Sequence, residues 1–348
     1  MAPRVGMTLA TAIRTGDAAE LPSRRDEDWR WTDLRGLLRT LPEPSRAFDG
    51  EPPVGPFAHL ADLPIHVVNA SSPVVIRCAS AKPYVVSLHF VALGGGSHTT
   101  SAQVEVAEGS HLILLESYEG DSDRYLANLD MNITVGPKAR LERIVLAADG
   151  AEGVSVSSTE ATLGADAQFS QTVLTDGARR QRIETRVAHP GAGASVRLDG
   201  AYLLSGQRHA DQTTVVGHMG ADGLTSQLTK GVVRDQSRGV FQGRIVVEEG
   251  ADRTDARMGH HALILSDRAE IDAKPELLIH ADEVACAHGN TIGALDEQAL
   301  FYMRQRGLPE IEARALLIEA FVGEVIDRID YEPAREIVRA WAEQRLRV

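Results

Sequence analysis

Cys286 and His288 are the residues whose types and spacing most directly suggest chemistry in this 348-residue chain. They stand two positions apart in the stretch from Glu270 to Gly307, where a strand-like pattern gives way to a helical one. Side chains two apart in an extended segment point to the same face, so the thiol and the imidazole are expected side by side. Such a pair can bind a metal or accept sulfur, although a buried cysteine beside a hydrogen-bonded histidine is the simpler alternative.

The overall composition is that of a globular chain with very few cysteines. Hydrophobic residues make up 43% and charged residues 24%, which suffices for a sizeable core. The formal net charge of -13 argues against a nucleic-acid partner, because such partners normally require a basic face. Cys78 and Cys286 cannot form a disulfide framework, so we expect a reducing, cytoplasmic location. No run reaches the roughly 18 apolar residues of a membrane span, and we expect no membrane association.

A repeat of about 28 residues runs through the middle of the chain. Short β-branched runs alternate with glycines, and the glycines of six similar segments are Gly109, Gly136, Gly164, Gly193, Gly220 and Gly250. Their successive spacings are 27, 28, 29, 27 and 30 residues, and a fixed period of this size is typical of repeat architectures. The units lack helical spacing. The repeat therefore predicts a mainly β fold, a right-handed parallel β-helix over residues 61–293 with glycines at corners of positive φ. A two-layered sandwich is the alternative.

Helical segments are predicted on both sides of the repeat, in residues 1–60 and 294–348. Residues 21–41 carry apolar side chains at helical spacing after a Ser23 cap, and a linker rich in proline and glycine follows. Trp29 and Trp31 of this stretch would either dock a partner or hold the helix on the body.

The C-terminal segment predicts two helices in succession. Asp296 and Glu297 suit the start of the first, and Gly307 ends it. The second carries one apolar stripe made of Ile311, Ala315, Ile318, Val322, Val325 and Ile329. A narrower stripe contains Leu317 and Phe321, so one face can pack on the body while the other either meets a partner or is also internal.

Two further patterns were considered for chemistry. His209, Asp211 and His218, together with His260 and His261, resemble scattered metal ligands, but their loose spacing favours ordinary hydrogen bonding. The sequence contains no GxxxxGK[ST] motif, so we expect no ATP site in this chain.

The stretch from Lys230 to Arg314 closely resembles the SufB/SufD family of iron-sulfur cluster assembly proteins. The motifs that carry the resemblance are GVFQGRI, AEIDAKPELLIHADEVACAHG and LFYMRQRG, and LPSRRDEDWRWTDL is similar to the N-terminal signature of the family. Specific matches cover the last third of the chain and the region near Trp29. The strand repeats between them resemble the family in general character only. The SufD branch is the better match, because the chain lacks the additional cysteines and the CxxCxxxC motif of SufB.

The resemblance implies a non-catalytic scaffold subunit that pairs with a SufB-like paralogue and binds a SufC-like ATPase. A transient iron-sulfur cluster would form at the interface between the paralogues, with His288 as a candidate ligand and Cys286 as a weaker one. Ala285 and Ala287 replace a Lys and a Ser that often flank this cysteine in relatives, which removes a positive charge beside the thiol. The ATPase would dock on residues 294–348, through Phe301, Leu317 and Phe321. A homodimer of the isolated chain and a flavin in the complex are left open.

Two other functions compete with this interpretation. One is a β-helix carbohydrate-active enzyme or a cupin-like metalloenzyme that uses the cluster at 209–218; aromatic residues, at 5%, are too sparse for a sugar-binding platform. The other is an inert structural scaffold in which Cys286 and His288 have no chemical role.

Overall fold

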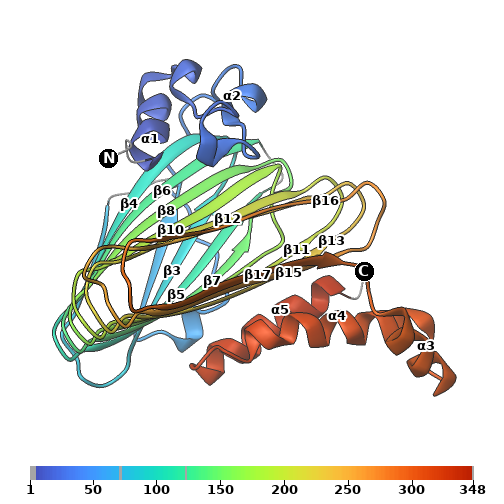
Figure 1. Cartoon of the computed structure of the whole chain (residues 1–348). Helices are drawn as coiled ribbons and strands as arrows, with labels where there is room; N and C mark the ends of the chain where they lie inside the picture. The colour runs from blue at the N-terminus through green and yellow to red at the C-terminus, as the bar shows by residue number, and fades with distance from the viewer. Residues whose placement is uncertain (1–4, 70–72, 122–123, 347–348) are drawn as a thin grey trace.

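A parallel β-solenoid forms the centre of the molecule, as the repeat predicts (Figure 1). The computed structural model describes residues 5–69, 73–121 and 124–346. Within those residues, successive strands alternate between a sheet of nine odd-numbered strands and a sheet of eight even-numbered strands, and all neighbours are parallel.

The strands are short and similar in length. The odd-numbered sheet consists of β1 (Leu63–Val68), β3 (Tyr84–Ala92), β5 (His111–Gly120), β7 (Arg140–Ala148), β9 (Gln168–Thr175), β11 (Ser195–Leu204), β13 (Leu224–Val233), β15 (Asp255–Ile264) and β17 (Ala285–Gly293). The even-numbered sheet consists of β2 (Val74–Cys78), β4 (Gly96–Val106), β6 (Tyr125–Val135), β8 (Val154–Leu163), β10 (Arg180–His189), β12 (His209–His218), β14 (Arg238–Val247) and β16 (Glu270–Ile279).

Strand register confirms the repeat period. Leu141 pairs with Phe169, which is 28 positions later, and Ala256 pairs with Cys286, which is 30 positions later. Each coil therefore satisfies the backbone hydrogen bonds of the coil before it, and alternate side chains enter one shared interior. That interior is mainly apolar, but it also holds the fully buried Arg143, whose Nε donates to Glu116 Oε1 at 2.6 Å.

Glycine is required at the corners of the repeat for two reasons. Only the first, positive φ, was predicted from the sequence. Gly109, Gly193 and Gly250 do adopt positive φ, the left-handed conformation that favours glycine. Gly164 does not; a side chain there would lie 2.6 Å from the backbone nitrogen of Pro137 in the preceding coil. At such corners glycine is required because adjacent coils approach each other closely.

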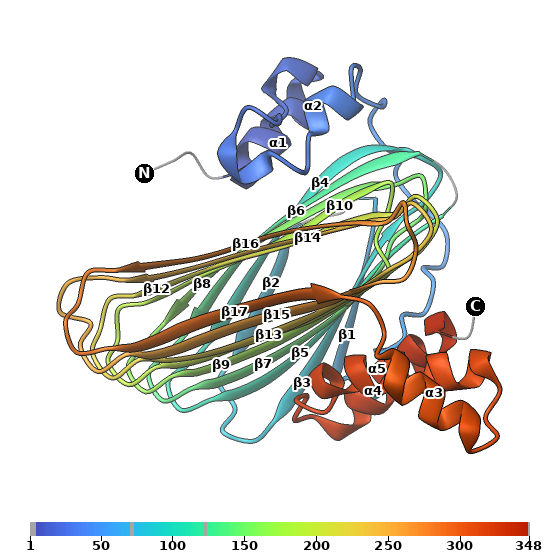
Figure 2. The ribbon, with the colours of Figure 1, turned by 45° about the vertical axis from the view of Figure 1, so that its right-hand side comes forward.

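The N-terminal segment covers the outer face of the even-numbered sheet, with its helices above β4 to β10 in Figure 2. It contains α1 (Val5–Thr15), the short 3-10 helices η1 (Ala18–Glu20) and η2 (Glu27–Trp29), and α2 (Leu34–Leu37); η3 (Ala58–Leu60) follows near β3. The helix predicted over 21–41 is therefore wrong.

Tertiary hydrogen bonds explain why that helix does not form. The carbonyl oxygen of Asp28 accepts from Arg182 Nη1 at 2.8 Å and from Gln242 Nε2 at 3.1 Å, and the carbonyl of Trp31 accepts from His209 Nε2 at 3.1 Å. The amides four residues later bond elsewhere, because Thr32 N donates to the Trp29 carbonyl and Arg35 N donates to the Pro22 carbonyl, both at 3.0 Å. Trp29 is buried with its ring 4.5 Å from the Arg182 guanidinium, so this tryptophan holds the segment on the body.

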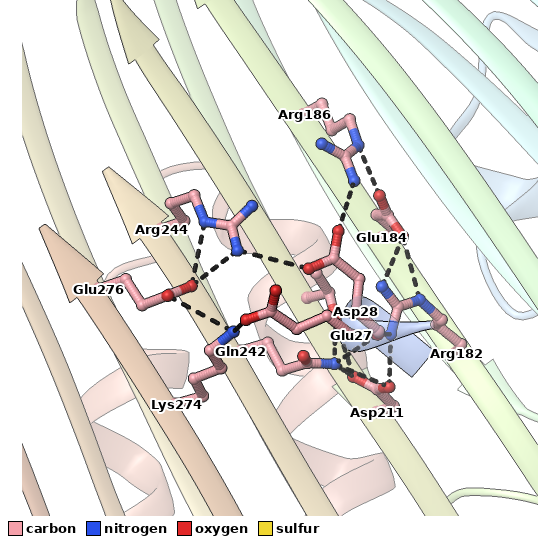
Figure 3. A network of polar contacts seen from close by, with 11 residues as sticks. Glu27, Asp28, Arg182, Glu184, Arg186, Asp211, Gln242, Arg244, Lys274 and Glu276 are labelled. Atoms are coloured by element: carbon pink, nitrogen blue, oxygen red, sulfur yellow. Dashed lines mark hydrogen bonds and ion pairs between the residues drawn. The ribbon is translucent and has the colours of Figure 1, made fainter. Parts of the chain in front are cut away.

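A network of charged groups links the segment to four strands, β10, β12, β14 and β16 (Figure 3). Fully buried Arg182 pairs with Glu184 and Asp211, both at 2.7 Å. At the other side of the network, Glu27 accepts from Lys274 Nζ at 2.7 Å, and Lys274 belongs to β16, the last strand of its sheet. The N-terminal segment is thereby linked to the final coil by an ion pair.

The C-terminal helices cover the outer face of the odd-numbered sheet. They are α3 (Glu297–Gln305), α4 (Glu310–Ile326) and α5 (Glu332–Leu346), and α4 and α5 pack on β11 and β13. Asp296 caps α3 by accepting from the amides of Gln298 and Ala299, and Gly307 follows that helix with φ of 92°, as predicted. No helix in the described part of the chain is long and apolar enough to cross a membrane.

Arg182→Met is expected to lower the free energy of unfolding by about 3–5 kcal/mol, because it leaves Glu184 and Asp211 buried without their cation. Urea unfolding followed by circular dichroism measures the change. As a control, Arg77→Met removes a pair whose two side chains are 71% and 52% exposed, and less than about 1 kcal/mol is expected. Equal losses in the two variants would contradict this assignment.

Candidate functional site at the open end of the solenoid

The last strand, β17, carries Cys286 and His288 on its interior face. Cys286 pairs in register with Ala256 of β15, and His288 pairs with Met258. Both β15 residues are buried in the apolar interior, so the thiol and the imidazole continue two interior columns of side chains. In the described residues no later strand covers them. The pair therefore lies over the open end of the solenoid.

Burial is the main feature of the surroundings of Cys286. Its side chain is half-buried and packs against the interior cluster. Burial raises the pKa of the Cys286 thiol, the nearby Asp255 carboxylate raises it further, and a hydrogen bond with the Ala256 backbone acts in the opposite direction. His288, by contrast, is exposed.

Asn290 is a third polar side chain on the same face, and it was not predicted as a site residue from the sequence. It pairs in register with the buried His260, whose Nδ1 lies 2.7 Å from Asn290 Oδ1. The other ring nitrogen of His260, Nε2, lies 2.8 Å from the hydroxyl of buried Tyr202. Burial lowers the pKa of His260 to about 4, so its ring is neutral near pH 7. The signal in the sequence was the repeat itself, since His260 stands one coil before Asn290.

The opposite wall of the open end is apolar. It is formed by β16, which lies opposite β17 in Figure 2. Leu277 and Ile279 of β16 continue interior columns through their pairing with Ile245 and Val247. Ile279 is 42% exposed, and on β17 Ile292 is 43% exposed. The end of the solenoid thus exposes apolar side chains around three polar groups.

Both terminal strands also have a free edge. Within the residues that the structure covers, β16 pairs only with β14, and β17 pairs only with β15. A free strand edge presents unpaired N–H and C=O groups, which are a template for pairing with another chain. Two such edges, side by side, make this end suited to a protein partner.

The scattered histidines do not form a second site. His209 and His218 stand at opposite ends of β12, and Asp211 accepts hydrogen bonds from Arg182 and from Thr32. His260 belongs to the chain of contacts with Asn290, and His261 Nδ1 lies 2.7 Å from Thr291 Oγ1. In the described ranges, no group of three or more His, Cys, Asp or Glu residues could hold a metal ion.

Helices α3 and α4 carry a group of exposed apolar side chains. We call it the α3–α4 patch, and its residues are Phe301 (63% exposed), Tyr302 (64%), Ile311 (81%) and Leu316 (45%). Leu317 and Phe321 are instead half-buried and pack in the cluster between α4 and the sheet. Lys230 Nζ lies 4.4 Å from the centre of the Phe321 ring. Of the three residues expected to dock a partner, only Phe301 is exposed.

Comparison with known proteins assigns the chain to a family. Residues 91–321 match the family model described as "SUF system FeS cluster assembly, SufBD core domain". The iron-sulfur cluster assembly protein SufD of Escherichia coli K12 is 27% identical, in an alignment that covers 99% of this chain and 93% of that protein. An iron-sulfur cluster assembly SufBD family protein of Mycobacterium tuberculosis is also 27% identical, over 95% of this chain and 91% of its own length.

A third relative matches over a shorter region. It is an iron-sulfur cluster assembly SufBD family protein of Synechocystis, which is 30% identical over 66% of this chain and 51% of its own length. The family model alone spans more than half of the chain and includes most of the solenoid and its open end. The chain therefore belongs to the SufBD family of iron-sulfur cluster assembly proteins.

Proposed function

We propose that this chain is the SufD-like scaffold subunit of a SUF assembly complex, in which it pairs with a SufB-like paralogue. The observation that carries the proposal is the open end of the solenoid. There, two free parallel strand edges flank Cys286 and His288, and the chain itself supplies nothing further to cover them in the described residues. Pairing through β16 and β17 would satisfy the free backbone groups and bury the exposed apolar side chains.

The side chains at the open end of the solenoid can supply half of the ligands of a binding site. Thiolate and imidazole groups both ligate iron in proteins, but a cluster normally requires four protein ligands. Cys286 and His288 offer two, so the paralogue would supply the others and the nascent cluster, as the substrate of the complex, would form between the chains. Because burial raises the pKa of Cys286, iron binding by this thiol must displace a proton. The exposed His288 faces no such burial, and it is the stronger candidate ligand.

The energy source would lie outside this chain. The sequence has no GxxxxGK[ST] motif, and ATP hydrolysis would be the work of a SufC-like ATPase docked on residues 294–348. The α3–α4 patch supports this, because exposed aromatic and aliphatic side chains clustered on helices mark protein contacts. This chain would then be a non-catalytic subunit. The cytoplasm suits the role, because the Cys286 thiol must stay reduced.

His288→Ala is expected to reduce the iron and sulfide bound by the complete complex several-fold while leaving the fold intact, because the imidazole is exposed and the strand keeps its register. The complex would be produced anaerobically with the SufB-like and SufC-like partners, and iron and acid-labile sulfide would be measured. His59→Ala is a matched control, since His59 is an exposed histidine of η3, near β3 in the first coils. Unchanged loading in His288→Ala would refute the proposed ligand.

Phe301→Asp and Ile311→Asp are expected to weaken binding of the SufC-like ATPase at least about tenfold, since each places a charge in an exposed apolar contact. Isothermal titration calorimetry would measure the dissociation constant. Phe321→Asp is expected to lower thermal stability as well, because Phe321 packs on the body.

Met219→Asp is the control for these variants, because Met219 is a 50% exposed residue at a corner of the solenoid. Normal ATPase affinity in both Phe301→Asp and Ile311→Asp would exclude the α3–α4 patch as the docking surface.

A further inference from the structure

Tyr202, His260 and Asn290 form a continuous row of polar contacts from the buried interior to the open end. These residues belong to β11, β15 and β17, and because β13 lies between β11 and β15, the row spans four coils. The first two are fully buried, with 0% exposure, while Asn290 is exposed. Cys286, His288 and Asn290 alternate along the interior face of β17, each about 7 Å from the next along the strand.

Two glycines leave the space that the Tyr202 ring occupies. A side chain at Gly231 would lie 2.2 Å from Cζ of Tyr202, and one at Gly239 would lie 2.4 Å from its Cε2. The imidazole of His260 stacks on Phe241, with ring centres 4.6 Å apart and ring planes within 2°. Both rings are therefore held in single orientations by close packing.

The direction of each hydrogen bond follows from Asn290 Oδ1, which can only accept. Its 2.7 Å contact therefore places a proton on Nδ1 of His260. Because the His260 ring is neutral, its Nε2 carries no proton and accepts from the Tyr202 hydroxyl. With its oxygen fixed toward the interior, the Asn290 side chain presents its NH₂ group away from His260. Within the described residues, that NH₂ group makes no hydrogen bond to a protein group.

We propose that Asn290 donates a hydrogen bond to a sulfur atom of the nascent cluster, and that His260 and Tyr202 are positioning residues that fix the orientation of its amide. The inference rests on the proposed function, because it needs a cluster at the open end. Hydrogen bonds to cluster sulfurs stabilise the more negative, reduced state and so raise the reduction potential. Tyr202 acts at a distance: without its hydroxyl, the His260 proton can move to Nε2, and the Asn290 amide can turn its oxygen to the site.

Asn290→Asp is the discriminating variant. It preserves the shape of the side chain and an oxygen that accepts from His260, but it replaces the outward NH₂ donors by a second oxygen. Tyr202→Phe is the matched distant variant, because it removes only one buried hydroxyl. A merely structural role for Asn290 at the end of the solenoid requires only the accepting oxygen, so it predicts little effect of Asn290→Asp on the cluster.

The experiment uses the full chain in complex with its SufB-like and SufC-like partners, loaded anaerobically with iron and sulfide. Cluster content and the reduction potential of the loaded cluster are measured for the wild type, His288→Ala, Asn290→Asp and Tyr202→Phe. We expect Asn290→Asp to lower loading several-fold and to make the potential of the remaining cluster more negative. Tyr202→Phe should keep most of the loading and shift the potential in the same direction. In the free wild-type chain, ¹⁵N NMR of His260 should show the proton on Nδ1.

Each outcome identifies which idea fails. If the wild type loads a cluster and His288→Ala loads several-fold less, the proposed function stands. Asn290→Asp with the loading and potential of the wild type would then overturn the inference alone. A His260 proton on Nε2 in the free chain would overturn the positioning role of Tyr202. A wild-type complex that loads no cluster, or an unaffected His288→Ala variant, would refute the proposed ligand site and the inference with it.

Discussion

Lateral pairing of parallel strands, one coil upon the next, is the constraint on which the rest of the structure depends. A strand in this solenoid obtains its backbone hydrogen bonds from the coils before and after it, so no strand is complete until the next coil is in place. Most of the chain meets this condition internally. Among the described strands, those at the sheet edges do not: β1 and β2 in the first coil, and β16 and β17 in the last, where the chain becomes helical after Gly293. The free edges, the exposed apolar side chains and the polar groups at the end all follow from this single interruption.

The two flanking segments leave the end formed by β16 and β17 uncovered in the described residues. The N-terminal segment covers the outer face of one sheet and is tied to it by Arg182 and by the Glu27–Lys274 pair, while α4 and α5 cover the other sheet. Neither flank extends over the interior columns of β16 and β17 in the described residues. The N-terminal network reaches β16, so a segment distant in sequence supports the strand that borders the candidate site. Its buried charges are all paired, which is the condition under which they stabilise a fold.

The sequence predicted the parts of the structure that depend on local repetition. The glycine period indicated the coils, and the caps around Asp296 and Gly307 indicated α3, because these signals act over a few residues or repeat many times. The segment 21–41 was misread because carbonyl contacts to β12 and β14 outcompete its helical spacing. Asn290 was missed because its partner His260 is distant in sequence, and only the register joins them. The rise in the pKa of Cys286 likewise depends on burial, which two-residue spacing does not reveal.

The central claim is that the open end is half of an interface completed by another chain. Amide hydrogen exchange of this protein, alone and with the SufB-like paralogue, tests that claim most directly because it reports the free edges of β16 and β17 themselves. We expect amides of both strands to exchange freely in the isolated chain and to become protected in the complex, while β5 to β11 change little. Protection elsewhere, with β16 and β17 exchanging as in the isolated chain, would contradict the account.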